Sequence, residues 1–169
     1  MFIIKLIIYI TIFCVSSGIG FIYSKKYIDR ENELKEIKSA LNICKTKMKF
    51  TYETIPEIFK YISNSMNGNV KKLFQKACEK MKTENAGEAW KQALDDTELN
   101  INNEDKEVLK SFSKLLGKTS LEGQISEIEL TCEFLDVQIK KAEIDRNKNE
   151  KLYRTLGIVG GAGMVIILI

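Results

Sequence analysis

Six oxygen-bearing side chains have the spacing of a calcium-binding loop. Positions 1, 3, 5, 7, 9 and 12 of such a loop are occupied by Asp96, Glu98, Asn100, Asn102, Glu104 and Glu107. An EF-hand loop also needs glycine at its sixth position for a sharp turn, and that residue is Ile101. The eighth position, usually apolar, is Asn103. We therefore interpret the segment as a solvated turn between helices and predict no metal site.

The residue types needed for most enzymatic chemistry are missing or scattered. The chain contains no histidine, which removes the commonest general base and the usual catalytic zinc ligand. It also has no P-loop to hold a nucleoside triphosphate. Carboxylates such as Glu53, Asp95 and Asp136 cannot be paired into an acid–base dyad from their positions. The sequence predicts a protein that is not an enzyme, with no catalytic residue and no cofactor.

The cysteines indicate the cellular compartment, and the charge balance narrows the class of partner. Cys14, Cys44, Cys78 and Cys132 form no CxxC pair, and the last three fall on apolar helical stripes. We expect reduced thiols, buried as small apolar side chains in a cytosolic compartment. The net charge is only +3, from 26 basic and 23 acidic residues, so no nucleic-acid partner is expected.

Both ends of the chain are apolar, whereas every acidic residue lies between Asp29 and Glu150. Residues 6–23 carry no charge and are almost as long as the ~20 residues with which a helix crosses a bilayer. Residues 155–169 form a second uncharged stretch, which can span if Tyr153 and Arg154 extend to the lipid interface. We predict an amino-terminal membrane helix (1–23), a helical body (24–154) and a carboxyl-terminal membrane helix (155–169).

The first apolar stretch has an alternative interpretation as a cleaved signal peptide, because Lys5 precedes it and Ser16-Ser17-Gly18 could follow a short apolar core. The run continues through Phe21-Ile22-Tyr23, past any plausible cleavage point, which favours an anchor. Lysine and arginine flank both stretches on the side of the body, at Lys25, Lys26, Arg30, Arg146, Lys148, Lys151 and Arg154. The positive-inside rule then predicts a hairpin with its body in the cytoplasm.

Glycine is concentrated in the apolar ends, which hold six of the ten glycines. Gly157 and Gly161 have the small-xxx-small spacing of helix contacts in lipid, with Gly160 beside them. We expect these residues to pack the two membrane helices together or against other membrane proteins. Glycine is also simply tolerated in membrane helices, and this interpretation stays open.

The middle of the chain shows the periodicity of an all-α bundle. A 4-3 apolar stripe follows each membrane segment on the side of the body: Tyr23, Tyr27, Arg30, Leu34, Ile37, Leu41, Cys44, Met48; and Leu121, Ile125, Ile128, Cys132, Leu135, Ile139, Ala142. Two such stripes predict an antiparallel pair of long helices. Capping patterns at Thr54–Glu57 (with Pro56) and Asn85–Glu88, and a stop at Gly117, predict four shorter helices between them. A third capping pattern at Thr119–Glu122 is predicted to open the long final helix. Trp90, spaced among alanines, is predicted to anchor the core.

These segments together resemble the stage III sporulation protein AB family of endospore-forming bacteria. The resemblance rests on residues 89–94 (AWKQAL), 107–110 (EVLK), 149–152 (NEKL) and 166–169 (IILI), with Phe112, Leu116-Gly117, Gln124 and Leu156-Gly157. Tyr52 and Pro56 are similar to the tyrosine and proline of the family's turn before its second helix. Lys47 and Lys49 depart from the family, which tends to carry acids before that turn.

The family is similar to the cytoplasmic six-helix domains of platform proteins in type II secretion and type IV pilus machines. The resemblance implies a non-enzymatic subunit of the channel complex in the outer forespore membrane, on the mother-cell side. Its implied partners are other channel subunits, membrane lipid and a cytoplasmic secretion-type ATPase, and a homo-oligomer is possible. The competing hypothesis is a secreted or membrane-perturbing helical protein whose first segment is cleaved.

Overall fold

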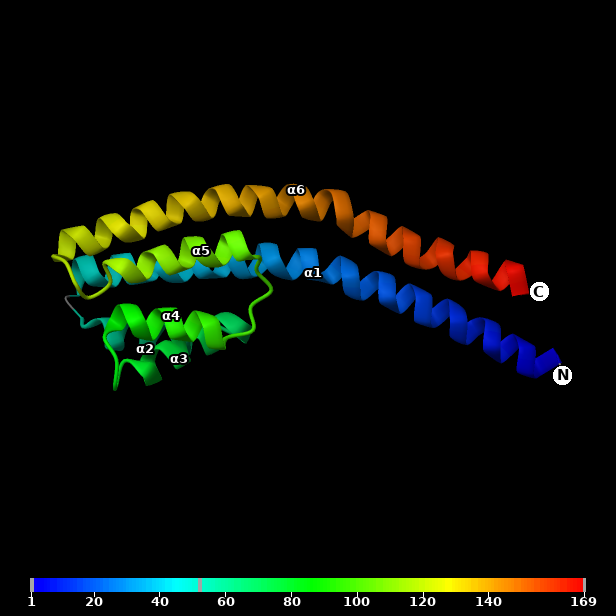
Figure 1. The fold of residues 1–169 in the computed structure, drawn as a ribbon, viewed down its shortest axis with the longest axis horizontal. Coiled ribbons are helices and arrows are strands. Elements are labelled where there is room, and N and C mark those ends of the chain that lie inside the picture. The colour runs from blue at the N-terminus through cyan, green and yellow to red at the C-terminus, as the bar shows by residue number, and fades with distance from the viewer. Residues whose placement is uncertain (1, 52, 169) are drawn as a thin grey trace. The chain divides into compact units, whose positions relative to one another are not determined.

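The computed structural model describes residues 2–51 and 53–168 of the chain, and within them it contains helices and no strand. Six α-helices follow one another: α1 (Phe2–Phe50), α2 (Ile55–Ser65), α3 (Gly68–Lys80), α4 (Ala86–Asp96), α5 (Asn103–Ser111) and α6 (Leu121–Leu168), with a 3-10 turn at Phe112–Lys114 after α5 (Figure 1). The prediction of an all-α protein is confirmed.

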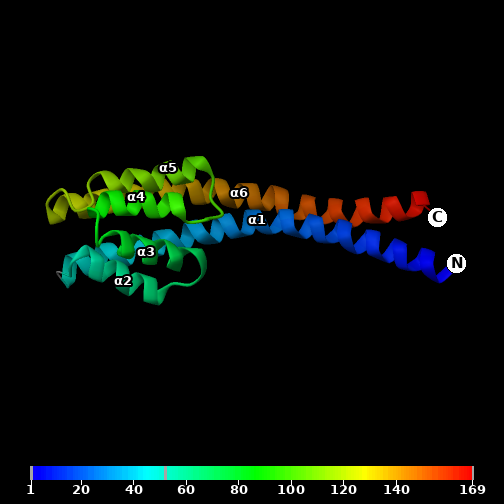
Figure 2. The ribbon, with the colours of Figure 1, turned by 60° about the horizontal axis from the view of Figure 1, so that its bottom comes forward.

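Two compact units share the two long helices. The first unit combines residues 1–31 with residues 141–169, and we call it the helix pair. The second unit is residues 32–140, and we call it the body. In the body, α3 packs against both α2 and α4, and Figure 2 shows the short helices of this unit.

The long helices run antiparallel within each unit. In the helix pair, Arg30 of α1 meets Asp145 of α6 at 2.8 Å, whereas near the chain ends the Tyr9 hydroxyl donates to the Leu168 carbonyl. In the body, the partner of Lys38 is Asp136. In these pairs the residue number rises along α1 as it falls along α6, which is the antiparallel arrangement that the two heptad stripes predict.

Buried side chains in the body follow the predicted stripes. On α1 they include Leu34, Ile37, Leu41, Cys44 and Met48, and on α6 they include Ile128, Cys132, Leu135 and Ile139. The short helices contribute the aromatic residues of the core. A 3.5-residue apolar spacing thus gives one continuous buried face on each long helix.

Local capping explains where the short helices begin. The Thr54 backbone N–H donates to Glu57 Oε2 at 2.8 Å, and Pro56 occupies the first turn of α2, as predicted. The Glu88 N–H donates to Asn85 Oδ1 at 3.0 Å at the start of α4. These side chains satisfy backbone groups that the first helical turn leaves unpaired.

Two predicted boundaries are wrong. The final helix is capped by Ser120, whose Oγ accepts from the Gly123 N–H at 3.3 Å, and not by a box from Thr119 to Glu122. The Thr119 carbonyl accepts from Gln124 Nε2 at 3.1 Å in the same turn. The fifth helix ends at Ser111 and continues as a 3-10 turn, whereas its apolar spacing predicted a helix up to Leu116.

Candidate functional site

Backbones approach closely in the helix pair where α1 and α6 meet at Gly20 and Gly157. A Cβ atom on Gly157 would lie 2.9 Å from the Ser16 carbonyl oxygen and 3.0 Å from the Gly20 Cα. A Cβ on Gly20 would lie 2.5 Å from the Tyr153 carbonyl oxygen. Only glycine leaves this space, because a Cβ at such distances would force the helices apart.

The other glycines in the apolar part of α6 differ in their surroundings. A Cβ on Gly161 would lie 3.1 Å from the Ser16 Cβ and 3.3 Å from the Phe13 ring, so this residue also faces α1. Gly160 lies at the edge of the contact, 3.8 Å from Ser16 Oγ by the same measure. Gly163 has nothing within 4 Å. Sequence reasoning proposed Gly157, Gly160 and Gly161 but did not find their neighbour Gly20.

A hydrogen bond joins the two helices at the same level. Ser16 Oγ on α1 donates to the Gly157 carbonyl on α6 at 2.9 Å. Serine is among the residues that hold helices together in lipid, because a hydroxyl there has no water to bind. The contact therefore combines close packing with a polar bond.

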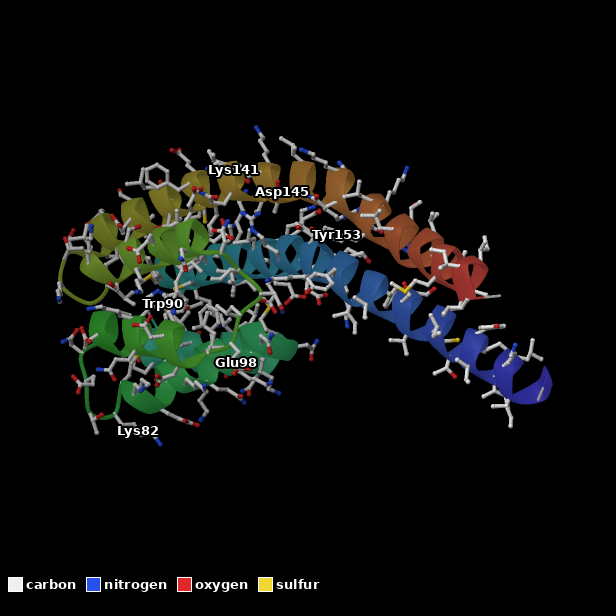
Figure 3. The ribbon with its side chains drawn as sticks, turned by 45° about the vertical axis from the view of Figure 1, so that its right-hand side comes forward. Lys82, Trp90, Glu98, Lys141, Asp145 and Tyr153 are labelled. Carbon is white, nitrogen blue, oxygen red and sulfur yellow. The ribbon has the colours of Figure 1, made fainter. Side chains whose placement is uncertain are left out.

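A polar layer follows the apolar contact along the helix pair. The Tyr153 ring stacks between Tyr23 and Tyr27, with ring centroids 5.7 and 5.8 Å away. Arg30 pairs with Asp145 at 2.8 Å, and Arg146 Nη1 pairs with Glu31 at 3.0 Å, so each helix gives one arginine and one acid. Figure 3 labels Tyr153 and Asp145 of this layer on α6. Amphipathic tyrosine rings and charges next to uncharged helix segments are typical of a membrane interface.

The body is centred on a cluster of four aromatic rings. Trp90, which is labelled in Figure 3, is fully buried. Its ring lies 5.3–5.6 Å, between centroids, from the rings of Phe59, Phe74 and Phe112. Its indole Nε1–H donates to the Leu109 carbonyl at 2.8 Å. This carbonyl is near the end of α5, where helical partners run out, so Trp90 fills the core and caps a neighbouring helix.

A buried carboxylate, which sequence reasoning missed, connects three segments of the body. Glu33 on α1 accepts from the Asn69 side chain at 2.8 Å, from the Asn100 side chain at 2.8 Å and from the Asn100 backbone N–H at 2.5 Å. It thereby fixes the start of α3 and the loop between α4 and α5 to the first long helix. The only signal in the sequence is that this acid lies next to a position of the apolar stripe, and that pattern does not indicate which residues it contacts.

The oxygen-rich segment after α4 is engaged in structural contacts. Asp96 pairs with Lys80 at 2.7 Å, and this partner holds the pKa of the Asp96 carboxyl below its usual range. Asn100 is bound by Glu33, and Asn102 caps α5 by accepting from the Asp105 N–H at 2.8 Å. Within residues 2–51 and 53–168, no three acidic or thiol side chains are grouped as ligands for a metal ion.

Two further residues of the proposed family pattern meet in the turn before α6. Gly117 has a φ of +74°, a left-handed conformation that a side chain strains, and its N–H donates to Gln124 Oε1 at 3.0 Å. Gln124 thus holds both Gly117 and the Thr119 carbonyl. Tyr52, the tyrosine of the predicted turn, lies outside the described residues.

The four thiols are free and unequally exposed. Cys44 and Cys132 are buried, Cys78 is half-buried and Cys14 is exposed. Burial raises the pKa of the Cys44 thiol to about 12, and the neighbouring Cys132 adds a smaller contribution. The expectation of a buried apolar role therefore holds fully for Cys44 and Cys132.

A hollow of about 410 Å³ lies in the body where α1 ends and α6 begins, and we call it the terminal cleft. Its lining includes Lys45, Lys49, Phe50, Glu122 and Glu129. Phe50 is 69% exposed, which is unusual for an aromatic side chain outside the apolar helix segments. An exposed ring framed by both signs of charge can accept a protein surface. Close by, Lys47 pairs with Glu53 at 2.9 Å.

Both long helices contain a segment that could cross a membrane, at least 18 residues long with at most two charges.

Comparison with known proteins gives consistent results. A family model described as stage III sporulation protein AB matches residues 5–169. The Stage III sporulation protein AB of Bacillus subtilis (strain 168) is 25% identical over 169 residues, covering 97% of this chain and 98% of that protein. A solved structure named Stage III sporulation protein AB shares the fold, with a TM-score of 0.66 and 22% identity over 71% of this chain and 98% of the other.

Proposed function

Because the chain belongs to the stage III sporulation protein AB family, we propose that it is a non-enzymatic membrane platform of the channel complex between mother cell and forespore. In this role it assembles with other sporulation subunits and docks a cytoplasmic ATPase of the secretion type. The body supplies the docking surface, and the helix pair supplies the anchor in the outer forespore membrane.

The observation that carries the proposal is the glycine-lined contact between two apolar helix segments. In water, exposed side chains such as Ile7, Ile22, Leu156 and Ile166 would be unfavourable in such number. In lipid they are suitably placed, and the close approach at Gly20 and Gly157 provides the packing that holds membrane helices together. This supports a hairpin anchor in which both segments stay in the bilayer.

The basic residues beside the apolar segments support a cytoplasmic body. They follow the first segment and precede the second, which is the distribution that the positive-inside rule describes. Cleavage after Ser16-Ser17-Gly18, the alternative interpretation, would remove Ser16 from its contact with α6. Mass spectrometry of the protein from the membrane fraction separates the two, since the anchor requires an intact amino terminus.

The terminal cleft is the surface of the body that we assign to ATPase docking. Its exposed Phe50 offers an anchor, and Lys45, Lys49, Glu122 and Glu129 offer charges that give a partner its orientation. No residue set on this surface suggests chemistry, so the energy for any transport would come from the partner.

The proposal is tested by co-purification of the full chain with the ATPase subunit from sporulating cells. We expect Phe50→Glu to reduce the recovered ATPase at least tenfold and to lower the yield of mature spores. Leu115→Glu is the matched control, because it places the same charge at another exposed apolar position, and it should leave recovery unchanged. Wild-type spore yield after clean deletion of the gene would overturn the proposed role.

A further inference from the structure

The net charge of the chain is concentrated in one layer of the helix pair. Residues 23–31 of α1 and 145–154 of α6 hold seven basic and four acidic side chains. The other residues of the chain hold 19 basic and 19 acidic side chains, so the whole net charge of +3 belongs to this layer, which we call the charged layer. Charge gathered in one place attracts a partner of opposite sign more strongly than the same charge spread over a surface.

The arginines of the charged layer are used within the chain, whereas its lysines are not. The arginine pairs are Arg30 with Asp145 at 2.8 Å, Arg146 with Glu31 at 3.0 Å and Arg154 with Glu150 at 3.6 Å. These pairs leave Asp29 as the remaining acid of the layer. The lysines are Lys25, Lys26, Lys148 and Lys151, and we call them the lysine collar. All four are exposed, and within residues 2–51 and 53–168 none of them has an ion-pair partner.

The lysine collar occupies one level along the helix pair. Two of its members are on α1 and two on α6, and all lie between the Arg30–Asp145 pair and the stack of Tyr23 on Tyr153. Asp145 and Tyr153, the limits of this level on α6, are labelled in Figure 3. From residue 23 to residue 30 a helix rises ~10 Å. The headgroup region on one side of a bilayer is ~5–8 Å thick and is commonly marked by tyrosine. The collar therefore has the depth of the headgroups when the uncharged segments lie in the bilayer.

We propose that the lysine collar binds the phosphate groups of anionic phospholipids such as phosphatidylglycerol. This role rests on the proposed membrane anchoring and adds the class of lipid that the anchor recognises. A lysine ammonium is a compact charge with three donors on a flexible stem, which suits a mobile phosphate. Each lysine near an anionic membrane surface strengthens the attraction about fivefold. An acidic protein segment would meet the same charges, but the adjoining uncharged helix segments favour lipid.

The experiment measures which lipids stay bound to the full chain after reconstitution in vesicles of equal parts phosphatidylcholine and phosphatidylglycerol. The protein is extracted in mild detergent, and its bound lipids are counted by native mass spectrometry. We expect at least fivefold more bound phosphatidylglycerol than phosphatidylcholine, whose choline cancels the phosphate charge. Extraction in roughly 1 M salt, where the screening length is ~3 Å, should abolish the preference. A preference below twofold, or one that salt leaves unchanged, overturns the inference.

A collar variant, in which all four collar lysines are changed to glutamine, should bind the two lipids equally. The matched control removes four exposed lysines of the body instead, with Lys82→Gln, Lys91→Gln, Lys114→Gln and Lys118→Gln. It changes the net charge by the same amount and should keep the preference. Arginine at the four collar positions keeps the charge and should also keep it. Far-UV circular dichroism verifies that each variant is helical. Equal preference in the collar variant and the control contradicts the assignment to the collar.

Inorganic phosphate distinguishes a lipid headgroup from a free anion as the bound group. At millimolar concentration during extraction it should leave the bound phosphatidylglycerol in place, because free phosphate has no acyl chains to lie against the apolar helix segments. Displacement of the lipid would assign the collar to soluble phosphate and overturn the lipid assignment.

Flotation with vesicles of phosphatidylcholine alone separates this inference from the proposed anchoring. Protein that floats with them but shows no preference for phosphatidylglycerol overturns the lipid assignment and leaves the anchor intact. Protein that floats only with anionic vesicles and is released by salt supports the collar and overturns the membrane-crossing anchor. Protein that floats with neither kind of vesicle removes both. Floating with phosphatidylcholine together with the fivefold preference supports both.

Discussion

At the scale of single residues, Trp90 joins packing with hydrogen bonding in the body. We expect Trp90→Phe to keep most of the aromatic packing but to leave the Leu109 carbonyl without its indole donor. The loss of this buried bond should lower the free energy of unfolding by about 1–3 kcal/mol. Thermal unfolding of the full chain in detergent, followed by circular dichroism, measures the effect. Tyr61→Phe, at an exposed position, should change it by less than about 0.5 kcal/mol.

Glu33 is a second residue whose polar contacts stabilise the body. Glu33→Gln keeps the shape of the side chain but turns an amide N–H₂ toward the donors of Asn69 and Asn100. We expect a loss of about 1–3 kcal/mol in the free energy of unfolding, because buried donors lose their acceptor. Denaturant titration monitored by the single tryptophan gives the value. Glu107→Gln, on an exposed side chain, should be neutral, and an equal loss there would contradict the assignment.

The buried thiol of Cys44 makes stability sensitive to alkaline pH. Its pKa rises from 9.0 to about 12 on folding, so the unfolded chain loses this proton at lower pH than the folded chain does. The stabilisation is complete below pH 9 and declines as the pH rises toward 12. Between pH 8 and 10.5, the wild type should lose about 2 kcal/mol more than Cys44→Ala, at about 1.4 kcal/mol per pH unit above 9. Parallel pH profiles of the two proteins would contradict this.

Residue roles were predictable only where one local pattern determines them. Trp90 was expected in the core because its neighbours at helical spacing are apolar, and Thr54 was expected to cap because a glutamate follows three residues later. The partners of Glu33 lie 36 and 67 residues away in sequence, and no local pattern encodes such a contact. The acceptor for the Trp90 indole was unpredictable for the same reason.

At the scale of helices, the contact between α1 and α6 depends on glycine at Gly157. Gly157→Leu would place atoms where Ser16 and Gly20 lie and should separate the helices at a cost of about 1–3 kcal/mol. A disulfide between Ser16→Cys and Gly160→Cys, in a Cys14→Ser background, reports the contact on non-reducing gels. Its yield should fall severalfold with Gly157→Leu.

Gly163→Leu is the control for this prediction, because nothing lies within 4 Å of a Cβ at that position. It adds the same side chain to the same apolar segment at a position where a Cβ meets no atom of α1. Unchanged disulfide yield is expected for this variant. A similar decrease in both variants would show that the added leucine acts through the segment in general rather than through the contact.

Periodicity predicted the long helices well, because a buried face repeats every three or four residues and does not depend on the identity of the partner. The small-xxx-small pattern at Gly157 and Gly161 indicated a contact face but left its partner open. Helix ends were less predictable. The cap of α6 lies at Ser120, whose hydroxyl accepts from the Gly123 N–H, one residue later than the spacing of Thr119 and Glu122 predicted.

At the scale of the whole molecule, the proposed topology makes a prediction about access from outside the cell. Glu107 has a side chain that is 74% exposed on the body, so Glu107→Cys offers a reactive thiol there. In a Cys14→Ser, Cys78→Ser background, a membrane-impermeant maleimide should label this thiol only after cells are permeabilised. Labelling in intact cells would place the body outside and contradict the platform role. Cys132 is a poor probe of sidedness because it is 8% exposed.

The antiparallel pairing of the long helices within the body also determines how long an apolar face of the nascent chain stays uncovered during synthesis. The stripe from Leu34 to Met48 leaves the ribosome about 80 residues before Ile128, the first fully buried residue of the stripe that covers it. At roughly 5–20 residues per second, the nascent chain displays an uncovered apolar face for about 4–16 s. We therefore expect slower translation to lengthen the time for which this apolar face depends on chaperones near the exit tunnel.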